Sequence, residues 1–296
     1  MKIEDISATK EKQKVATISV FAAIAITLGK LIVGLSTMSL GILSEALHSA
    51  LDFVAAAITY FAVKISDKPA DENHHYGHGK FENLSAFIET LLLFITCFWI
   101  IYEALHRLIS GKTEIEISIW AYIVVIASII IDYGRSKALM KVAKKYNSQA
   151  LEADALHFST DIWSSAVVLI GLICAQFGFF MADSIAALIV AFIVIYIAYR
   201  LGKRSIDVLL DRTSIETYKK IEEILINIPE VLTYHNLKIR SSGAYTFVEV
   251  NIHVDPKLTI EKAHEISHNV ELYICDKINK CEVHVHEEPE NDHAKN

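Results

Sequence analysis

Long apolar stretches alternate with short polar ones over roughly the first 210 residues of the chain. Residues 15–35 contain only one charged side chain, residues 84–101 contain only Glu89, and residues 117–131 contain none. About 20 apolar residues cross the hydrocarbon core of a bilayer, and these stretches reach that length with their flanks. The pattern predicts six membrane-spanning helices, at residues 14–35, 38–66, 82–109, 117–141, 153–177 and 183–205.

Beyond residue 211 the pattern becomes that of a small soluble domain. Thr213-Ser-Ile-Glu216 is a capping box, which starts a helix, and Pro229 ends it. Two strands, a second helix and a third strand are then predicted, at residues 231–240, 245–254, 259–278 and 281–287. This α-β-β-α-β order within about 80 residues indicates an open α+β sandwich.

Composition and charge agree with a membrane protein whose termini are cytoplasmic. Hydrophobic residues make up 53% of the chain, which is more than an ordinary soluble domain contains. With six spans both termini share one side, where lysine and arginine concentrate, and the opposite loops hold only Arg107 and Lys112. We expect residues 1–13 to be a polar, mobile cytosolic N-terminus without a cleavable signal peptide. The four cysteines form no CxxC pair, so no disulfide framework is expected.

The chemically informative residues lie inside the spans, in a pattern that occurs twice. The second and fifth spans contain Glu45-x2-His48-x3-Asp52 and Asp154-x2-His157-x3-Asp161. Residues three and four apart share a helix face, and charged groups at bilayer depth must face one another or water. Two imidazoles and two carboxylates suit tetrahedral Zn²⁺. The alternative is a pair of hydrogen bonds that only hold the helices together.

Two further histidine clusters lie outside the spans. The segment 71–80 holds three histidines and two carboxylates and could wrap one ion, or it could be a solvated loop. In the C-terminal domain, histidines recur on both strands and helices beside acidic residues: His235, His253, His264, His268, His284, His286, Glu287 and Glu288. This clustering favours metal binding over scattered surface histidines.

Taken together, these motifs resemble those of the cation diffusion facilitator family, over residues 14–289. The resemblance is carried by His48-x3-Asp52, His157-x3-Asp161, Pro69-Ala-Asp71…His74…Tyr76-Gly-His78-Gly-Lys80, Leu209-Leu-Asp211-Arg212 and His284-Val-His286-Glu-Glu-Pro289. It implies an all-α six-helix transmembrane domain at residues 14–210 and a cytosolic α+β ferredoxin-like, metallochaperone-like domain at residues 211–290, followed by the tail 291–296. It also implies a homodimer that exchanges metal for protons by alternating access.

The resemblance also implies the roles of particular residues. It maps the transport site to His48, Asp52, His157 and Asp161, the loop site to Asp71, His74 and His78, the binuclear cytosolic site to His235, His253, His264, His286 and Glu288, and the charged dimer interlock to Lys80 and Asp211. His264 would reach the site of the partner subunit. Some members carry Asp at the position of His48, and the His form is associated with zinc over cadmium. Glu288 stands where some members have Asp, and its longer side chain can still bridge two ions.

These residues predict a secondary transporter and not an enzyme. Protons and metal ions compete for a neutral imidazole, so we predict proton-coupled efflux of a divalent metal. Zn²⁺ is the expected cargo and the expected ligand of the cytosolic domain. The alternatives are the same transporter with Fe²⁺, Mn²⁺, Co²⁺ or Cd²⁺ as cargo, and more remotely a membrane metal sensor or a metallohydrolase, although no HExxH motif occurs. We expect contact with membrane lipid in a bacterial or archaeal inner membrane, and neither a nucleic-acid partner nor an organic cofactor.

Overall fold

The computed structural model describes residues 3–37, 40–110, 119–176, 181–278 and 280–290. The chain divides into two compact units, one of Met1–Pro69 and Phe81–Ile206 and the other of Ala70–Lys80 and Asp207–Asn296. The loop between the second and third helices therefore belongs to the same unit as the C-terminal domain. The sequence pattern alone, which places this loop between two spans, does not indicate that grouping.

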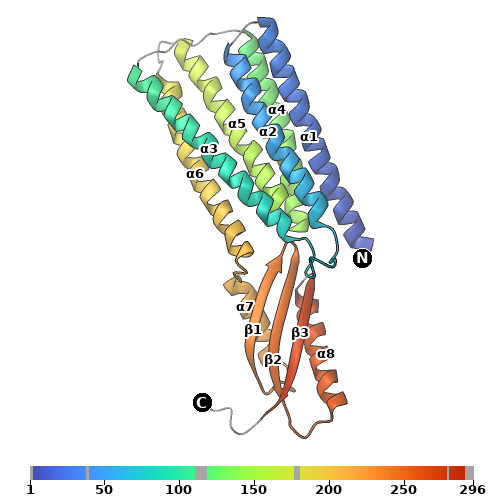
Figure 1. The fold of residues 1–296 in the computed structure, drawn as a ribbon. Helices are drawn as coiled ribbons and strands as arrows, with labels where there is room; N and C mark the ends of the chain where they lie inside the picture. Colours follow the sequence, from blue (N-terminus) through green and yellow to red (C-terminus); the bar gives the residue numbers. More distant parts are fainter. Residues whose placement is uncertain (1–2, 38–39, 111–118, 177–180, 279, 291–296) are drawn as a thin grey trace. The chain divides into compact units, whose positions relative to one another are not determined.

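Six long helices form the first unit, as predicted (Figure 1). They are α1 (Ile3–Thr37), α2 (Leu40–Ser66), α3 (Lys80–Ser110), α4 (Ile119–Tyr146), α5 (Gln149–Gln176) and α6 (Met181–Leu209). Among the described residues, α1, α2, α3 and α6 contain stretches long and apolar enough to cross a membrane: Ser7–Ser36, Ala46–Ser66, Lys80–His106 and Ser184–Leu209. The predicted all-α membrane domain is therefore confirmed.

The expectation of a mobile N-terminus is wrong for the described residues, because α1 already begins at Ile3. Lys12 is buried and its Nζ lies 3.0 Å from Glu82 Oε1 at the start of α3, and it also pairs with Asp67 beyond the end of α2. Lys145 Nζ of α4 lies 2.6 Å from Glu11 Oε2. These ion pairs hold the polar first turns of α1 against three other segments, which a composition argument does not reveal.

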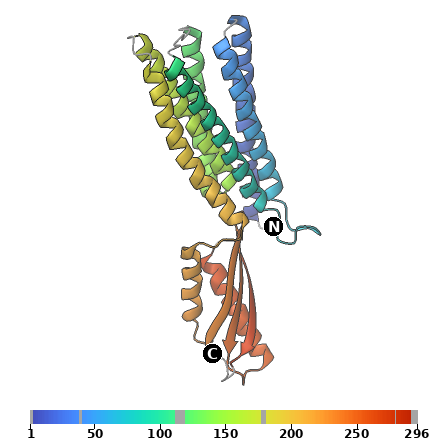
Figure 2. The same ribbon diagram turned by 60° about the vertical axis from the view of Figure 1, so that its left-hand side comes forward.

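The six helices pack through three sets of buried side chains. Small residues allow close helix approach, and alanines supply much of the contact among α1, α2, α4 and α5: Ala16, Ala23, Ala56, Ala143 and Ala155. The helices α3 and α6 lie side by side in both views (Figures 1 and 2), joined by Leu93, Cys97, Val194 and Ala198. The first set holds α2 against α5, the two helices that carry the repeated His and Asp pattern.

The C-terminal part of the second unit has the predicted α-β-β-α-β order. It comprises α7 (Ile215–Ile226), β1 (Thr233–Ser242), β2 (Tyr245–Val254), α8 (Ile260–Lys277) and β3 (Cys281–Pro289). The Ser214 side chain caps α7 by accepting a hydrogen bond from the Thr217 amide. The strand order is β1-β2-β3, with β1 antiparallel and β3 parallel to β2. A parallel pair needs a crossover, which α8 provides, and both helices pack on the sheet through one apolar core that includes Ile221, Val250, Ile252 and Ile274. The predicted ferredoxin-like domain is confirmed.

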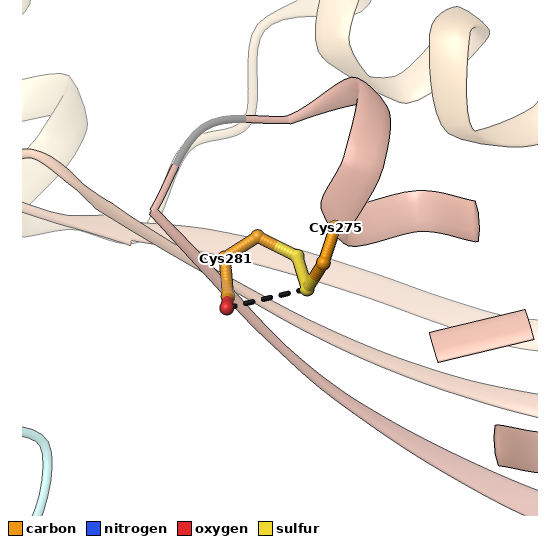
Figure 3. Close-up of a disulfide and its surroundings, with 2 residues drawn as sticks. All are labelled: Cys275 and Cys281. Atoms are coloured by element: carbon orange, nitrogen blue, oxygen red, sulfur yellow. Dashed lines mark hydrogen bonds between the residues drawn. A yellow bond between two sulfur atoms is a disulfide. The ribbon is translucent and has the colours of Figure 1, made fainter. Parts of the chain in front are cut away.

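A disulfide joins Cys275 near the end of α8 to Cys281 at the start of β3 (Figure 3). We expected no disulfide framework, and that expectation is wrong for this pair. The chain turns back between α8 and β3, which brings the two Cα atoms to 5.3 Å although six residues separate them in sequence. That distance is normal for a disulfide. The fold therefore brings the two cysteines together, although they do not form the CxxC motif on which the sequence prediction was based.

Candidate metal centres

The candidate transport site lies between α2, which carries His48 and Asp52, and α5, which carries His157 and Asp161. His157 Nε2 lies 3.2 Å from Asp52 Oδ1 and 3.8 Å from Asp161 Oδ2. His48 Nε2 lies 3.9 Å from Asp52 Oδ1 and 3.8 Å from Asp161 Oδ1. The structure thus brings all four predicted residues together, with each histidine facing both aspartates.

The spacing of three of these side chains fits a bound cation, because one ligand atom each from His48, Asp52 and Asp161 lies within 4.8 Å of the others, while His157 contacts both aspartates from outside that group. Ligands about 2.0 Å from a tetrahedral Zn²⁺ are about 3.3 Å apart, and the imidazole–carboxylate separations here run from 3.2 to 3.9 Å. Asp52 and His157 are buried, while the side chain of His48 is 36% exposed. Two carboxylates can balance the charge of a divalent ion, and two imidazoles favour zinc over cations that prefer oxygen ligands.

The loop site is assembled by Asp71, whose side chain organises the turn around it. Its Oδ1 accepts hydrogen bonds from the backbone amides of Asn73 at 2.9 Å and His74 at 2.7 Å. These amides lower the pKa of Asp71, so the carboxylate stays ionised as the pH falls until that lowered pKa is reached. His74 Nδ1 lies 3.2 Å from Asp71 Oδ1, and His78 Nε2 lies 3.3 Å from Asp71 Oδ2. All three predicted loop residues therefore converge.

The cytosolic site gathers on one face of the sheet. His253 Nε2 lies 3.1 Å from His235 Nδ1 and 3.7 Å from Glu288 Oε2, and His286 Nε2 lies 3.6 Å from Glu288 Oε1. Strand pairing explains the convergence, since His253 is opposite Glu288 in the β2–β3 register. His264 lies exposed on α8 and does not join the group formed by His235, His253 and Glu288.

The predicted charged pair also forms within this unit. Lys80 Nζ lies 2.7 Å from Asp211 Oδ1. Asp211 adopts a left-handed backbone conformation with φ of 58°, which Asp tolerates better than most side chains. The contact connects the end of the loop 70–80 to the chain entering the C-terminal domain.

Sequence reasoning missed buried polar groups that no metal-ligand spacing marks. Asp154, part of the repeated pattern, is fully buried, and its Oδ2 accepts a hydrogen bond from Ser19 Oγ of α1 at 3.1 Å. Glu89 of α3 is also fully buried. The only sequence signal for Glu89 is that it stands alone in an otherwise uncharged stretch of 18 residues, 84–101.

Comparison with known proteins agrees with this geometry. Residues 16–210 match the cation efflux transmembrane domain, and residues 214–290 match the cytoplasmic domain of cation efflux proteins. The molecule is therefore an integral membrane transporter that exports divalent metal cations. It belongs to the cation diffusion facilitator family, and its match to that cytoplasmic domain implies dimerisation.

Relatives extend the match over almost the whole chain. An uncharacterized transporter of Methanocaldococcus jannaschii is 33% identical over 279 residues, which is 93% of this chain and 98% of the relative. The cation-efflux pump FieF of Shewanella oneidensis is 30% identical over 272 residues, which is 92% of each chain. The metal-bound C-terminal domain of the CzcD transporter from Thermotoga maritima is 32% identical, covers 26% of this chain and 92% of its own, and gives a TM-score of 0.25.

Proposed function

We propose that this protein exports Zn²⁺ from the cytosol in exchange for protons, by alternating access, as a homodimer in the cell membrane with both termini cytoplasmic. The observation that carries the proposal is the cluster of two imidazoles and two carboxylates between α2 and α5, with separations of 3.2 to 3.9 Å. This ligand set suits zinc, and its histidines bind either a metal ion or a proton. Competition between the two is the basis of an exchanger.

The loop site and the cytosolic site have supporting roles in this proposal. Asp71, His74 and His78 form a loop site, and the cytosolic residues His235, His253, His286 and Glu288 form a regulatory site that His264 of the partner subunit completes. In this proposal residues 14–210 form the transport domain, and residues 211–290 form the domain for metal binding and dimerisation. The ion pair between Lys80 and Asp211 supports the dimer.

The test is metal and proton flux in sealed vesicles that contain the purified protein and a pH dye. Zn²⁺ should drive proton movement in the opposite direction, and Fe²⁺, Mn²⁺, Co²⁺ and Cd²⁺ should compete weakly. A different order of metals would reassign the cargo. Metal flux without proton movement would contradict the exchange mechanism.

Replacing Asp52 or Asp161 with Ala should abolish Zn²⁺ flux in a correctly inserted protein, because the site loses a ligand and half of its negative charge. The affinity should fall by more than the roughly 10–100-fold that loss of an outer-shell contact costs. Glu152→Gln is the matched control, since Glu152 lies on α5 but pairs with Arg204. Normal flux in the Asp52→Ala, Asp161→Ala double variant would show that the transport site lies elsewhere.

A further inference from the structure

Glu89 of α3 is a fully buried carboxylate outside the candidate metal centres. Its Oε1 accepts hydrogen bonds from Thr59 Oγ1 of α2 and, at 3.2 Å, from Ser85 Oγ one helical turn earlier. Its Oε2 is buried and has no hydrogen-bond partner among the described residues. Within the same described ranges, no lysine, arginine or histidine forms an ion pair with it. Its hydrogen-bond partners are therefore two hydroxyl groups.

The position of Glu89 separates it from the metal ligands. Its partner Thr59 follows Asp52 by seven residues on α2, so both project from one face, about 10 Å apart along the helix. That displacement points toward the end of α2 that continues into the loop 70–80, the side we propose to be cytosolic. Neither of its hydrogen-bond partners, Thr59 and Ser85, is a proposed metal ligand. Glu89 is thus outside the proposed set of metal ligands.

Some other buried carboxylates of the membrane unit form ion pairs with cationic side chains. Asp132 lies 3.0 Å from Arg135 Nη1, and Glu82 lies 3.0 Å from Lys12 Nζ. An ionised carboxylate without a cation is very costly in a low-dielectric interior, and such a group takes up a proton instead. Glu89 therefore has hydroxyl groups as hydrogen-bond partners, whereas Asp132 and Glu82 form ion pairs with cationic side chains.

The groups that face Glu89 strengthen this argument. Asp154 and His157 of α5 are the ionisable residues that act on it electrostatically, and α2 contributes the Thr59 hydroxyl. Asp154 is itself fully buried, and its Oδ1 has no hydrogen-bond partner in the part of the chain that the structure describes. Two such carboxylates repel each other when both are ionised, which adds to the cost of ionising Glu89.

We propose that Glu89 is a neutral carboxylic acid in this state and carries one of the protons exchanged for the metal ion. This rests on the proposed function as a proton-coupled exporter. When water from the cytosolic side reaches Glu89, its O–H bond breaks and the proton leaves to that water. The carboxylate later takes a proton that has entered from the outer side, so one proton moves inward per cycle and no other reactant is consumed. Carboxyl groups buried in membrane helices serve such relays in pumps and transporters.

The first test compares wild type, Glu89→Gln and Ser85→Ala in vesicles that report metal and protons together. Gln copies the shape and hydrogen bonds of the neutral acid but cannot release a proton. Glu89→Gln should bind Zn²⁺ normally and move one proton fewer per metal ion than wild type, since a neutral carboxyl holds one. Ser85→Ala removes a hydroxyl from the same oxygen and should keep the wild-type ratio.

Two outcomes of that test overturn different statements. An unchanged proton-to-metal ratio in Glu89→Gln, with a coupled wild type, assigns Glu89 a purely structural role and leaves the exporter proposal standing. A wild type that transports Zn²⁺ without protons overturns both proposals.

The infrared spectrum supplies a second test, which does not depend on transport and which the Thr59→Val variant decides. Metal-free wild-type protein should show the carbonyl stretch of a buried carboxylic acid. Thr59→Val removes a hydrogen bond to that group and should move the band to higher frequency, and Glu89→Gln should remove it. If no acid band responds to the Thr59→Val substitution, Glu89 is ionised and the proposal is wrong.

Discussion

At the scale of single residues, the buried acidic side chains of the membrane unit differ mainly in the groups that they contact. Asp52 faces His157 at 3.2 Å, Asp132 faces Arg135 at 3.0 Å, and Glu89 accepts hydrogen bonds from two hydroxyl groups. A carboxylate beside imidazoles can share a cation with them, one beside a guanidinium forms an internal ion pair, and one without either holds a proton. The partner group, on the same helix for Asp132 and on another helix for Asp52, therefore decides the role of each acidic residue.

Metal selectivity is a residue-scale property, and His48 is the position at which to change it. His48→Asp replaces a nitrogen donor with a harder oxygen donor. The side chain of His48 is partly exposed, so the substitution does not disturb a closely packed core. We expect Cd²⁺ or Mn²⁺ to gain several-fold relative to Zn²⁺ in competition for transport. His75→Asp serves as the control, because His75 belongs to none of the three clusters. Unchanged competition curves would assign selectivity to the packing around the site.

At the scale of elements, the loop 70–80 packs on the β1–β2 hairpin. The Arg240 guanidinium lies 3.5 Å from the centre of the Tyr76 ring, and Tyr76 meets Phe247 edge to face at 5.3 Å. Gly79 is required at this contact, since a Cβ there would lie 2.4 Å from the carbonyl oxygen of Ser242. The loop metal site is thereby attached to the sheet that carries the cytosolic site.

Removing the Arg240 side chain should loosen the loop. A cation–π contact contributes about 0.5–2 kcal/mol, so Arg240→Ala should speed amide hydrogen exchange in residues 70–80 by about twofold to 30-fold. Lys238→Ala is the matched control, because Lys238 is exposed two residues away on the same strand. Equal exchange rates in the two variants would mean that Gly79 and the Lys80–Asp211 ion pair hold the loop without Arg240.

At the scale of the whole molecule, we propose that metal in the cytosolic unit regulates transport. The unit has its own apolar core, and the acidic residues Glu288 and Glu290 lie beside His253. Like charges that repel across a dimer interface are neutralised when a divalent ion binds. A ligand shifts an equilibrium only by its different affinities for the two states, so metal that fits only the closed dimer favours that state.

The isolated segment 212–296 should therefore bind Zn²⁺ and become more compact. His286→Ala and His264→Ala should weaken both effects, and in the full protein they should lower transport without abolishing it. His268→Ala is the control, since His268 lies on α8 beside Glu271 and outside the cluster. Calorimetry and small-angle scattering measure binding and shape. No uptake at about 10⁻⁵ M Zn²⁺, a concentration suited to sensor sites, with an unchanged shape would refute the regulatory role.

The local periodicity of apolar residues was sufficient to predict most of the helices and strands of this protein. Apolar stretches and caps predicted the six helices and the α-β-β-α-β domain, because the hydrophobic period is a property of neighbouring residues. The four-residue spacings of His48 and Asp52, and of His157 and Asp161, placed each pair on one helix face. Since α2 and α5 are antiparallel, the two faces could be matched without coordinates.

Contacts between distant segments were decided only by the tertiary structure. Lys12 reaches Glu82 across 70 residues, and Cys275 meets Cys281 because α8 turns back into β3. The loop 70–80 joins the C-terminal unit through Arg240, which no spacing in the sequence indicates. Glu89 shows the reason most clearly. The sequence by itself determines that an acid interrupts an apolar helix, but its charge depends on whether packing sets a cation or a hydroxyl beside it.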